Sequence, residues 1–399
     1  MALKSLPTFH DSRYLYTGLL AFADTGNKMP TKELERRVRQ GISDYVTEQQ
    51  SKYLLAERTP SYQKIPFYVI SELTTYGLLE RNKSNGDMFC LTDEGQHLLD
   101  LLLQRRGLLV RTRLAALYLQ TFTKPLYFQK RLWELGDDPG LKIPEINYST
   151  LDPLKRHGAS QLDTVVKALG VEIADELSKQ VGIRFSLDQF IAAITHELRS
   201  HDWREETKQK SFQAVRRALD NFMLPVFFPN AEISRPKFDV LRDRNDTFGL
   251  LNRRRLVKKA LTWEHVYLTS WIEPPMQRQQ DTSHDDFLTA NVDSATLYVH
   301  EPEWLSARDR FGEALKSSWM KCRLPIGYAR IVDLRNDVCF ALKISNETFD
   351  GFMRRLAEGG EPKVVFSSSP ERYTTKAMPL YLGQGRTYNL VRLESRKQL

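Results

Sequence analysis

Apolar residues recur at helical spacing in the middle of the chain. Ser186 with Gln189 three residues later is typical of a helix start, so a helix is expected from 187 to about 198. A further helix is predicted from Lys208 to Met223, and we expect Pro225 to end it because proline lacks an amide hydrogen. Another is predicted over 162–177, where the apolar positions are Leu162, Val165, Val166, Leu169, Ile173 and Leu177.

The stretch 59–103 predicts a helix, a hairpin and a second helix. The first helix is expected from Pro66 to about Tyr76, burying Val69, Ile70 and Leu73, with Gly77 as its stop. Two short apolar segments then flank Asn85-Gly86, a dipeptide typical of hairpin turns. Thr92 is expected to cap a helix from Asp93 to about Leu103.

Helix, hairpin and helix in this order resemble the winged-helix family, over residues 31–103. The ending Phe89-Cys90-Leu91-Thr92-Asp93-Glu94-Gly95 is similar to the point where the wing strand enters the next helix in bacterial members. The resemblance implies a helix 66–76 that enters the DNA major groove and a wing that touches the backbone. The same fold also serves as a dimerisation or scaffold module.

Residues 304–393 resemble the same family. Helices are predicted over 331–342 and 345–357, and strands at Val364-Val365-Phe366 and Tyr388-Asn389-Leu390-Val391. The predicted class is therefore mainly α with small β-hairpins (α+β), with winged-helix modules at both ends of a helical middle domain. The expected divisions are an N-terminal domain 1–135, a linker 136–160, a middle domain 161–272, a linker 273–294 and a C-terminal domain 295–399.

Charge favours a polyanionic partner. The net charge is +8 with a pI of about 9.2, which fits nucleic acid but also an ordinary basic soluble protein. No apolar run is long enough to span a bilayer, no signal peptide is recognised, and three scattered cysteines fit a reducing compartment. We expect a cytoplasmic protein that does not enter a membrane.

The first module offers one set of DNA-binding candidates. On the helix and its approach they are Lys64, Tyr68, Ser71 and Thr75, beside Tyr62 and Gln63, with Arg81 and Lys83 on the wing. Glu72 is expected on the same face, where it would oppose phosphate. Arg36, Arg37 and Arg39 on the preceding helix could compensate, or form a solvated helix face.

Two further basic stretches add candidates. In the middle domain they are Arg253, Arg254, Arg255, Lys258 and Lys259, expected on a helix that buries Leu250, Val257 and Leu261. The alternative is a solvated face that pairs with Asp243, Asp246 and Glu264. In the C-terminal module, Glu347 and Asp350 count against groove reading by the helix, so Arg372, Lys376 and Arg386 on the hairpin are the candidates.

Catalysis is not favoured by any motif. His196 and His201 are five apart, which rotates the second away from the first on a helix, and no cysteine pair has zinc spacing. No phosphate-binding loop or nucleophile elbow is present, so no cofactor and no metal are predicted. Asp239, Asp243 and Lys237 are only loosely compatible with a metal-dependent nuclease.

The leading hypothesis is a non-catalytic protein that binds double-stranded DNA. It would serve as the recognition or loading subunit of a bacterial multi-protein assembly, of which anti-phage defence systems are one class. The first alternative is a protein–protein scaffold that uses its winged helices for assembly. The second is a metal-dependent nuclease subunit.

Overall fold

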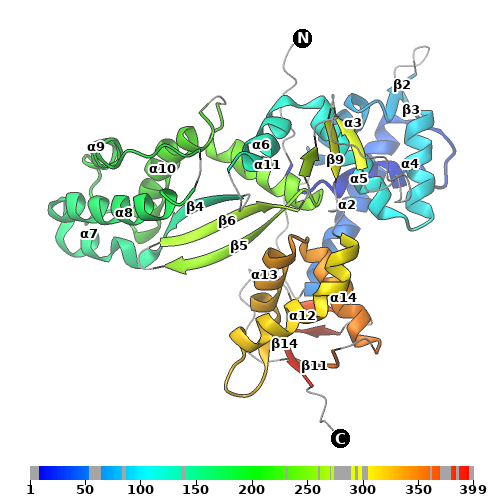
Figure 1. The fold of residues 1–399 in the computed structure, drawn as a ribbon. Helices are drawn as coiled ribbons and strands as arrows, with labels where there is room; N and C mark the ends of the chain where they lie inside the picture. Colours follow the sequence, from blue (N-terminus) through cyan, green and yellow to red (C-terminus); the bar gives the residue numbers. More distant parts are fainter. Residues whose placement is uncertain are drawn as a thin grey trace, which may run out of the picture. The chain divides into compact units, whose positions relative to one another are not determined.

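The structure is a computed structural model of the 399-residue chain. It describes residues 9–53, 64–82, 87–135, 140–180, 182–229, 232–258, 261–269, 271–273, 289–292, 295–298, 304–359, 362–368, 379–382 and 386–394. These residues form helices and small antiparallel sheets (Figure 1), which confirms the predicted α+β class. The chain divides into two compact units: 1–123, 243–252 and 269–399 form unit 1, and 124–242 and 253–268 form unit 2.

The N-terminal module of unit 1 consists of three helices and a three-stranded sheet. Its elements are α1 (Tyr14–Leu20), β1 (Lys28–Pro30), α2 (Thr31–Tyr53), α3 (Ile65–Thr75), β2 (Leu79–Arg81) and β3 (Met88–Leu91). The sheet order is β1-β3-β2, and both pairings are antiparallel. The helices α4 (Asp93–Leu103) and α5 (Gly107–Thr121) follow.

Local chemistry explains why α3 and the hairpin form where the sequence predicts them. Gly77 has a φ of +74°, a conformation that glycine adopts without steric cost, and it turns the chain from α3 into β2. Thr92 accepts a hydrogen bond from the amide of Gly95 and caps α4. A Cβ at Gly95 would lie 2.2 Å from the carbonyl oxygen of Leu78, so only glycine fits there. Val69, Ile70 and Leu73 are buried, as expected.

The C-terminal part of unit 1 repeats this order of elements. It contains α12 (Trp304–Cys322), β10 (Ala329–Arg330), α13 (Ile331–Leu342), α14 (Asn346–Ala357), β11 (Val364–Ser367), β12 (Leu380–Tyr381), β13 (Thr387–Tyr388) and β14 (Leu390–Leu393). Its sheet order is β10-β14-β11, so the first strand of the module again pairs with the last. Phe311, Leu315, Val338 and Phe349 lie in one buried core there, and Ser345 caps α14.

Three short strands also belong to unit 1 and form a sheet of order β7-β9-β8. They are β7 (Trp271–Glu273), β8 (Thr289–Val292) and β9 (Ala295–Tyr298). Strand β8 lies within the predicted linker 273–294, of which 274–288 and 293–294 lie outside the described residues.

Unit 2 combines helices with a sheet of order β4-β6-β5 (Figure 1). Its elements include α6 (Thr123–Trp133), β4 (Gly140–Ile146), α7 (Asp152–His157), α8 (Leu162–Leu177), α9 (Leu187–Leu198), α10 (Lys208–Phe227), α11 (Arg235–Thr247, continuing into unit 1), β5 (Leu251–Lys258) and β6 (Leu261–Leu268). The start of α9 at a cap by Ser186 and the extent of α8 are as predicted.

Three expectations for this region are wrong. The predicted linker 136–160 contains β4 and α7, and β4 pairs along its whole length with β6. Pro225 lies inside α10 and lacks the amide that would bond the carbonyl four residues earlier, and the helix ends two residues later, at Phe227. The basic stretch around Arg253 is a strand, so Val257 is 75% exposed instead of sharing a buried face with Leu250 and Leu261.

One buried ion pair holds α3 to the segment 243–252 within unit 1. Arg244 is fully buried, and its Nη2 donates to a carboxylate oxygen of Glu72 on α3. The hydroxyl of Tyr76 donates to the same carboxylate at 2.5 Å. The guanidinium also lies over three aromatic rings, with centroid distances of 4.6 Å to Phe9, 5.1 Å to Tyr118 and 5.2 Å to Phe248. A charge removed from water is stable only with such partners.

We predict that Arg244→Met lowers the free energy of unfolding by about 3–5 kcal/mol, because it leaves the Glu72 carboxylate buried without its counter-charge. Urea denaturation of the full chain measures this loss. The control Arg39→Met removes an exposed guanidinium and should change stability by about 0.5 kcal/mol or less. Equal losses for the two variants would contradict the assignment.

Candidate nucleic-acid interface

The outer face of α3 carries polar and aromatic side chains without a carboxylate. Lys64, just before the helix, is exposed, and Phe67, Ser71 and Thr74 are exposed one or two turns apart. Tyr68 and Thr75 are partly exposed beside them. Of the predicted candidates here, Lys64, Tyr68, Ser71 and Thr75 therefore lie on one surface, whereas Tyr62 and Gln63 lie outside the described residues.

The expectation that Glu72 opposes phosphate on this face is wrong. Its side chain is turned into the core, and the residue is 6% exposed. Burial raises the pKa of Glu72, and the guanidinium of Arg244 and the hydroxyl of Tyr76 oppose that shift. Since Glu72 is the sole acidic residue of α3, the helix presents no negative side chain to a polyanion.

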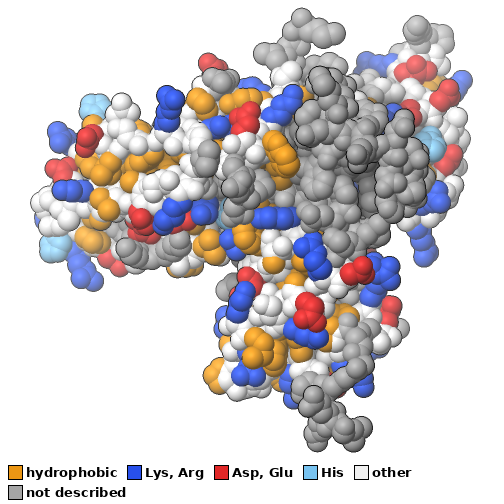
Figure 2. All heavy atoms as spheres, viewed as in Figure 1, with side chains coloured by type: hydrophobic (Ala, Val, Ile, Leu, Met, Phe, Trp, Pro, Cys, Tyr) orange, Lys and Arg blue, Asp and Glu red, His pale blue; other side chains and the backbone are white. Residues whose placement is uncertain are grey.

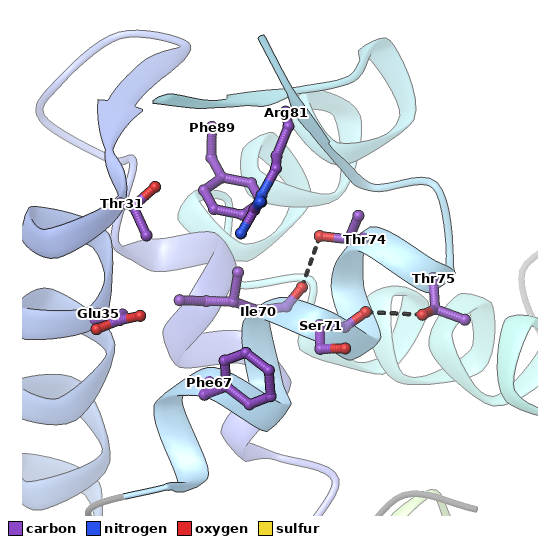
Figure 3. Close-up of a pocket in the computed structure, with 9 residues that line it drawn as sticks. All are labelled: Thr31, Glu35, Phe67, Ile70, Ser71, Thr74, Thr75, Arg81 and Phe89. Atoms are coloured by element: carbon purple, nitrogen blue, oxygen red, sulfur yellow. Dashed lines mark hydrogen bonds between the residues drawn. The ribbon is translucent and has the colours of Figure 1, made fainter. Parts of the chain in front are cut away.

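A hollow with a volume of about 260 Å³ lies beside this face (Figure 3). Its walls come from the start of α2, from α3 and from the β2–β3 hairpin, and they are formed by Thr31, Glu35, Phe67, Ile70, Ser71, Thr74, Thr75, Arg81 and Phe89. The hydroxyls of Thr74 and Thr75 donate to carbonyls one turn earlier, each at 2.8 Å.

The β2–β3 hairpin contributes Arg81 to the same surface. This residue is exposed at the end of β2, pairs in register with Phe89, and holds its guanidinium 5.2 Å from the centre of the Phe89 ring. The ring fixes the guanidinium next to the hollow while leaving its donors available. Lys83, the second wing candidate, lies outside the described residues.

The arginines of α2 are less available than the sequence indicates. Glu33 accepts hydrogen bonds from Arg36 at 2.7 Å and 2.8 Å and from Arg37 at 2.8 Å. Arg37 also donates to the carbonyl of Ala21 at 3.2 Å. These arginines lower the pKa of Glu33 to about 2. Arg39, in contrast, is exposed, and no ion pair is recorded for it among the described residues.

The middle basic cluster is divided between two faces of β5, because successive side chains of a strand point to opposite sides. Arg253 lies 3.5 Å from Glu264, and Arg255 donates to Glu145 at 2.8 Å. Arg254 points the other way and lies 3.4 Å from the ring of His265. The prediction of a continuous phosphate-binding helix face is therefore wrong for this segment. Lys259 lies outside the described residues, as does the side chain of Lys258.

In the C-terminal module, Asp350 does not face solvent as the sequence analysis assumed. It accepts two hydrogen bonds from the buried Arg335, at 2.7 Å and 3.0 Å. Glu347 is exposed and pairs with Arg111. Arg386 is exposed immediately before β13, whereas Arg372 and Lys376 lie outside the described residues.

The nuclease candidates do not form a cation site. The carboxylate of Asp239 lies 3.0 Å from Arg235 and 3.2 Å from Arg242, so two guanidinium groups already neutralise it. Lys237 is exposed, and Asp243 lies 2.9 Å from the ring of His10. Within the described ranges, no three His, Cys, Asp or Glu residues group so that they could hold a metal ion.

Side chains of both charges lie on the face of the molecule that Figure 2 shows. Figure 2 shows Lys and Arg side chains interspersed with Asp and Glu over the described part of that face. On α3 itself no acidic side chain is exposed, because the carboxylate of Glu72 is buried.

Comparison with known proteins adds no assignment, since no protein-family model, no curated protein and no solved structure matches the chain. No helix among the described residues is both long and apolar enough to cross a bilayer.

The sequence analysis missed Phe67 and Thr74 on the candidate surface. Phe67, Ser71, Thr74 and Thr75 follow a spacing of four, three and one residues, which places them on one side of a helix. That spacing could have identified both. An exposed phenylalanine was overlooked because apolar residues of a helix are more often assigned to its buried side.

We predict that the carboxylate of Glu33 titrates with a midpoint near pH 2, against an ordinary value of 4.5. Because folding lowers this pKa, the pairing of Glu33 with the two arginines stabilises α2 fully above about pH 4.5. That stabilisation is lost as the pH falls toward 2. NMR titration that follows the side-chain carboxyl carbon of Glu33 measures the midpoint. The double variant Arg36→Gln, Arg37→Gln should return it toward 4.5, and an unchanged midpoint would contradict the pairing.

Proposed function

We propose that the N-terminal module, residues 14–103, is a winged helix that binds double-stranded DNA through the outer face of α3, with Arg81 as a backbone contact. The order helix, strand, two helices and a hairpin, with the first strand paired to the last, supports this class. The same order in 304–393 supports a second module of the same kind. We propose that the chain acts as a DNA-recognition subunit rather than as a nuclease.

The observation that carries the proposal is the burial of Glu72 against Arg244. An exposed carboxylate in the middle of α3 would meet the phosphates or base edges of a groove and cost several kcal/mol in like-charge repulsion. With Glu72 in the core, α3 presents Ser71, Thr74 and Thr75, side chains that suit contacts to DNA. Lys64 and Arg81 add positive charge at two edges of the same surface.

A second candidate function is docking of a protein partner on this face, and one observation favours it. Phe67 is 58% exposed, so its ring is available to a partner. In this case α3 would bind an apolar side chain of the partner and the full chain would have no measurable affinity for a DNA duplex.

We predict that the full chain binds a mixed-sequence duplex in a gel-shift assay at about 50 mM salt and releases it as salt is raised. Ser71→Glu should weaken binding by about tenfold or more, because it places a carboxylate on the outer face of α3, where the natural chain has none.

The matched control is Ser160→Glu, which makes the same change at an exposed serine of unit 2 and should bind as the natural chain does. Absence of binding at low salt, or equal affinities of the two variants, would refute DNA binding by α3.

A further inference from the structure

We propose that the hollow beside α3 receives the 5-methyl group of thymine, so that the module reads A·T base pairs in the major groove. This inference rests on the proposed DNA binding and adds the chemical group that is recognised. In the major groove a thymine is distinguished by that methyl group, and phenylalanine rings and threonine methyls are its usual apolar contacts.

The hollow is smaller than most sites that hold a cofactor or drug-sized ligand. Its volume of about 260 Å³ is below the ~300–1,000 Å³ typical of small-molecule and cofactor sites. It is bounded on one side by α3, the helix proposed to enter the groove, and on the other by the hairpin (Figure 3). A base edge that projects from a groove could enter it without leaving the stack of bases.

The lining of the hollow is more apolar than its residue types indicate. Thr74 and Thr75 use their hydroxyl hydrogens within α3, on the carbonyls of Ile70 and Ser71. Their remaining contribution to an occupant is a methyl group and an oxygen acceptor. Together with the exposed ring of Phe67, these side chains form a surface that fits a methyl group.

The charges around the hollow favour a neutral occupant over a phosphate. Glu35 lines it from α2 and Arg81 lines it from β2 (Figure 3). A phosphate inside the hollow would lie against the Glu35 carboxylate, which repels it. A base edge carries no net charge and can lie between the two groups, while Arg81 remains near enough to the rim to contact the backbone.

The test compares an A·T-rich duplex with the same duplex in which uracil replaces every thymine, so that only the methyl groups are removed. We expect the natural full chain to bind the thymine duplex more tightly, by about fourfold for each methyl group that is buried. Phe67→Ala should lower affinity for the thymine duplex and remove the difference between the two duplexes. Thr74→Ser, which deletes one methyl group and keeps the hydroxyl, should reduce the difference.

The control is Thr47→Ser, the same change at an exposed threonine of α2 outside the hollow, which should keep the full difference. Equal affinity of the natural chain for both duplexes would overturn thymine reading while leaving DNA binding intact. Retention of the difference by Phe67→Ala would also overturn it, because the methyl group would then be read elsewhere. Absence of binding to either duplex at low salt would overturn the proposed function itself.

Discussion

The pairing of Arg244 with Glu72 is the constraint on which the N-terminal module depends. A guanidinium and a carboxylate that have both lost water are costly unless they meet, and here they meet across 172 residues of sequence. The pair fixes the rotation of α3, because Glu72 must face Arg244 for its charge to be compensated. Ser71 and Thr74 then face outward, since they lie about 100° and 160° around the helix from Glu72 in the same direction.

This pairing also explains why the module is not an independent N-terminal domain. Residues 243–252 cluster with 1–123 in unit 1 although most of unit 2 separates them in sequence. Arg244 contributes the counter-charge, and Phe248 packs its ring 5.1 Å from that of Tyr118. A fragment that ended near residue 135, as the sequence suggested, would leave Glu72 buried without a partner. Unit 1 therefore requires the segment 243–252, which lies in sequence between the two parts of unit 2.

Local chemistry made the α3–hairpin–α4 region predictable. The helix stop at Gly77, the helix cap at Thr92 and the apolar spacing of α3 each depend only on residues nearby in the sequence. Their roles can therefore be inferred without knowledge of the fold. The basic strand β5 could not be inferred in this way. Its charges suggested a helix, whereas in the sheet Arg253 pairs with Glu264 on the adjacent β6, and Arg255 pairs with Glu145 on β4, the far strand of the same sheet.

Much of the candidate surface could likewise be predicted, and the missing parts have a common reason. Ser71, Thr75 and Arg81 were identified because polar residues on a helix and a wing are expected outside. Glu72 and Asp350 were placed outside by the same rule, although each is buried against an arginine of another helix. A buried acid is invisible in sequence because its partner need not be near it in the chain.

Hydrogen exchange of the full chain, with and without a DNA duplex at low salt, tests the central claim most directly. The account predicts that DNA slows exchange in α3 and in the β2–β3 hairpin and leaves β5 unchanged. Protection confined to β5, or a duplex bound without any change in α3, would contradict it.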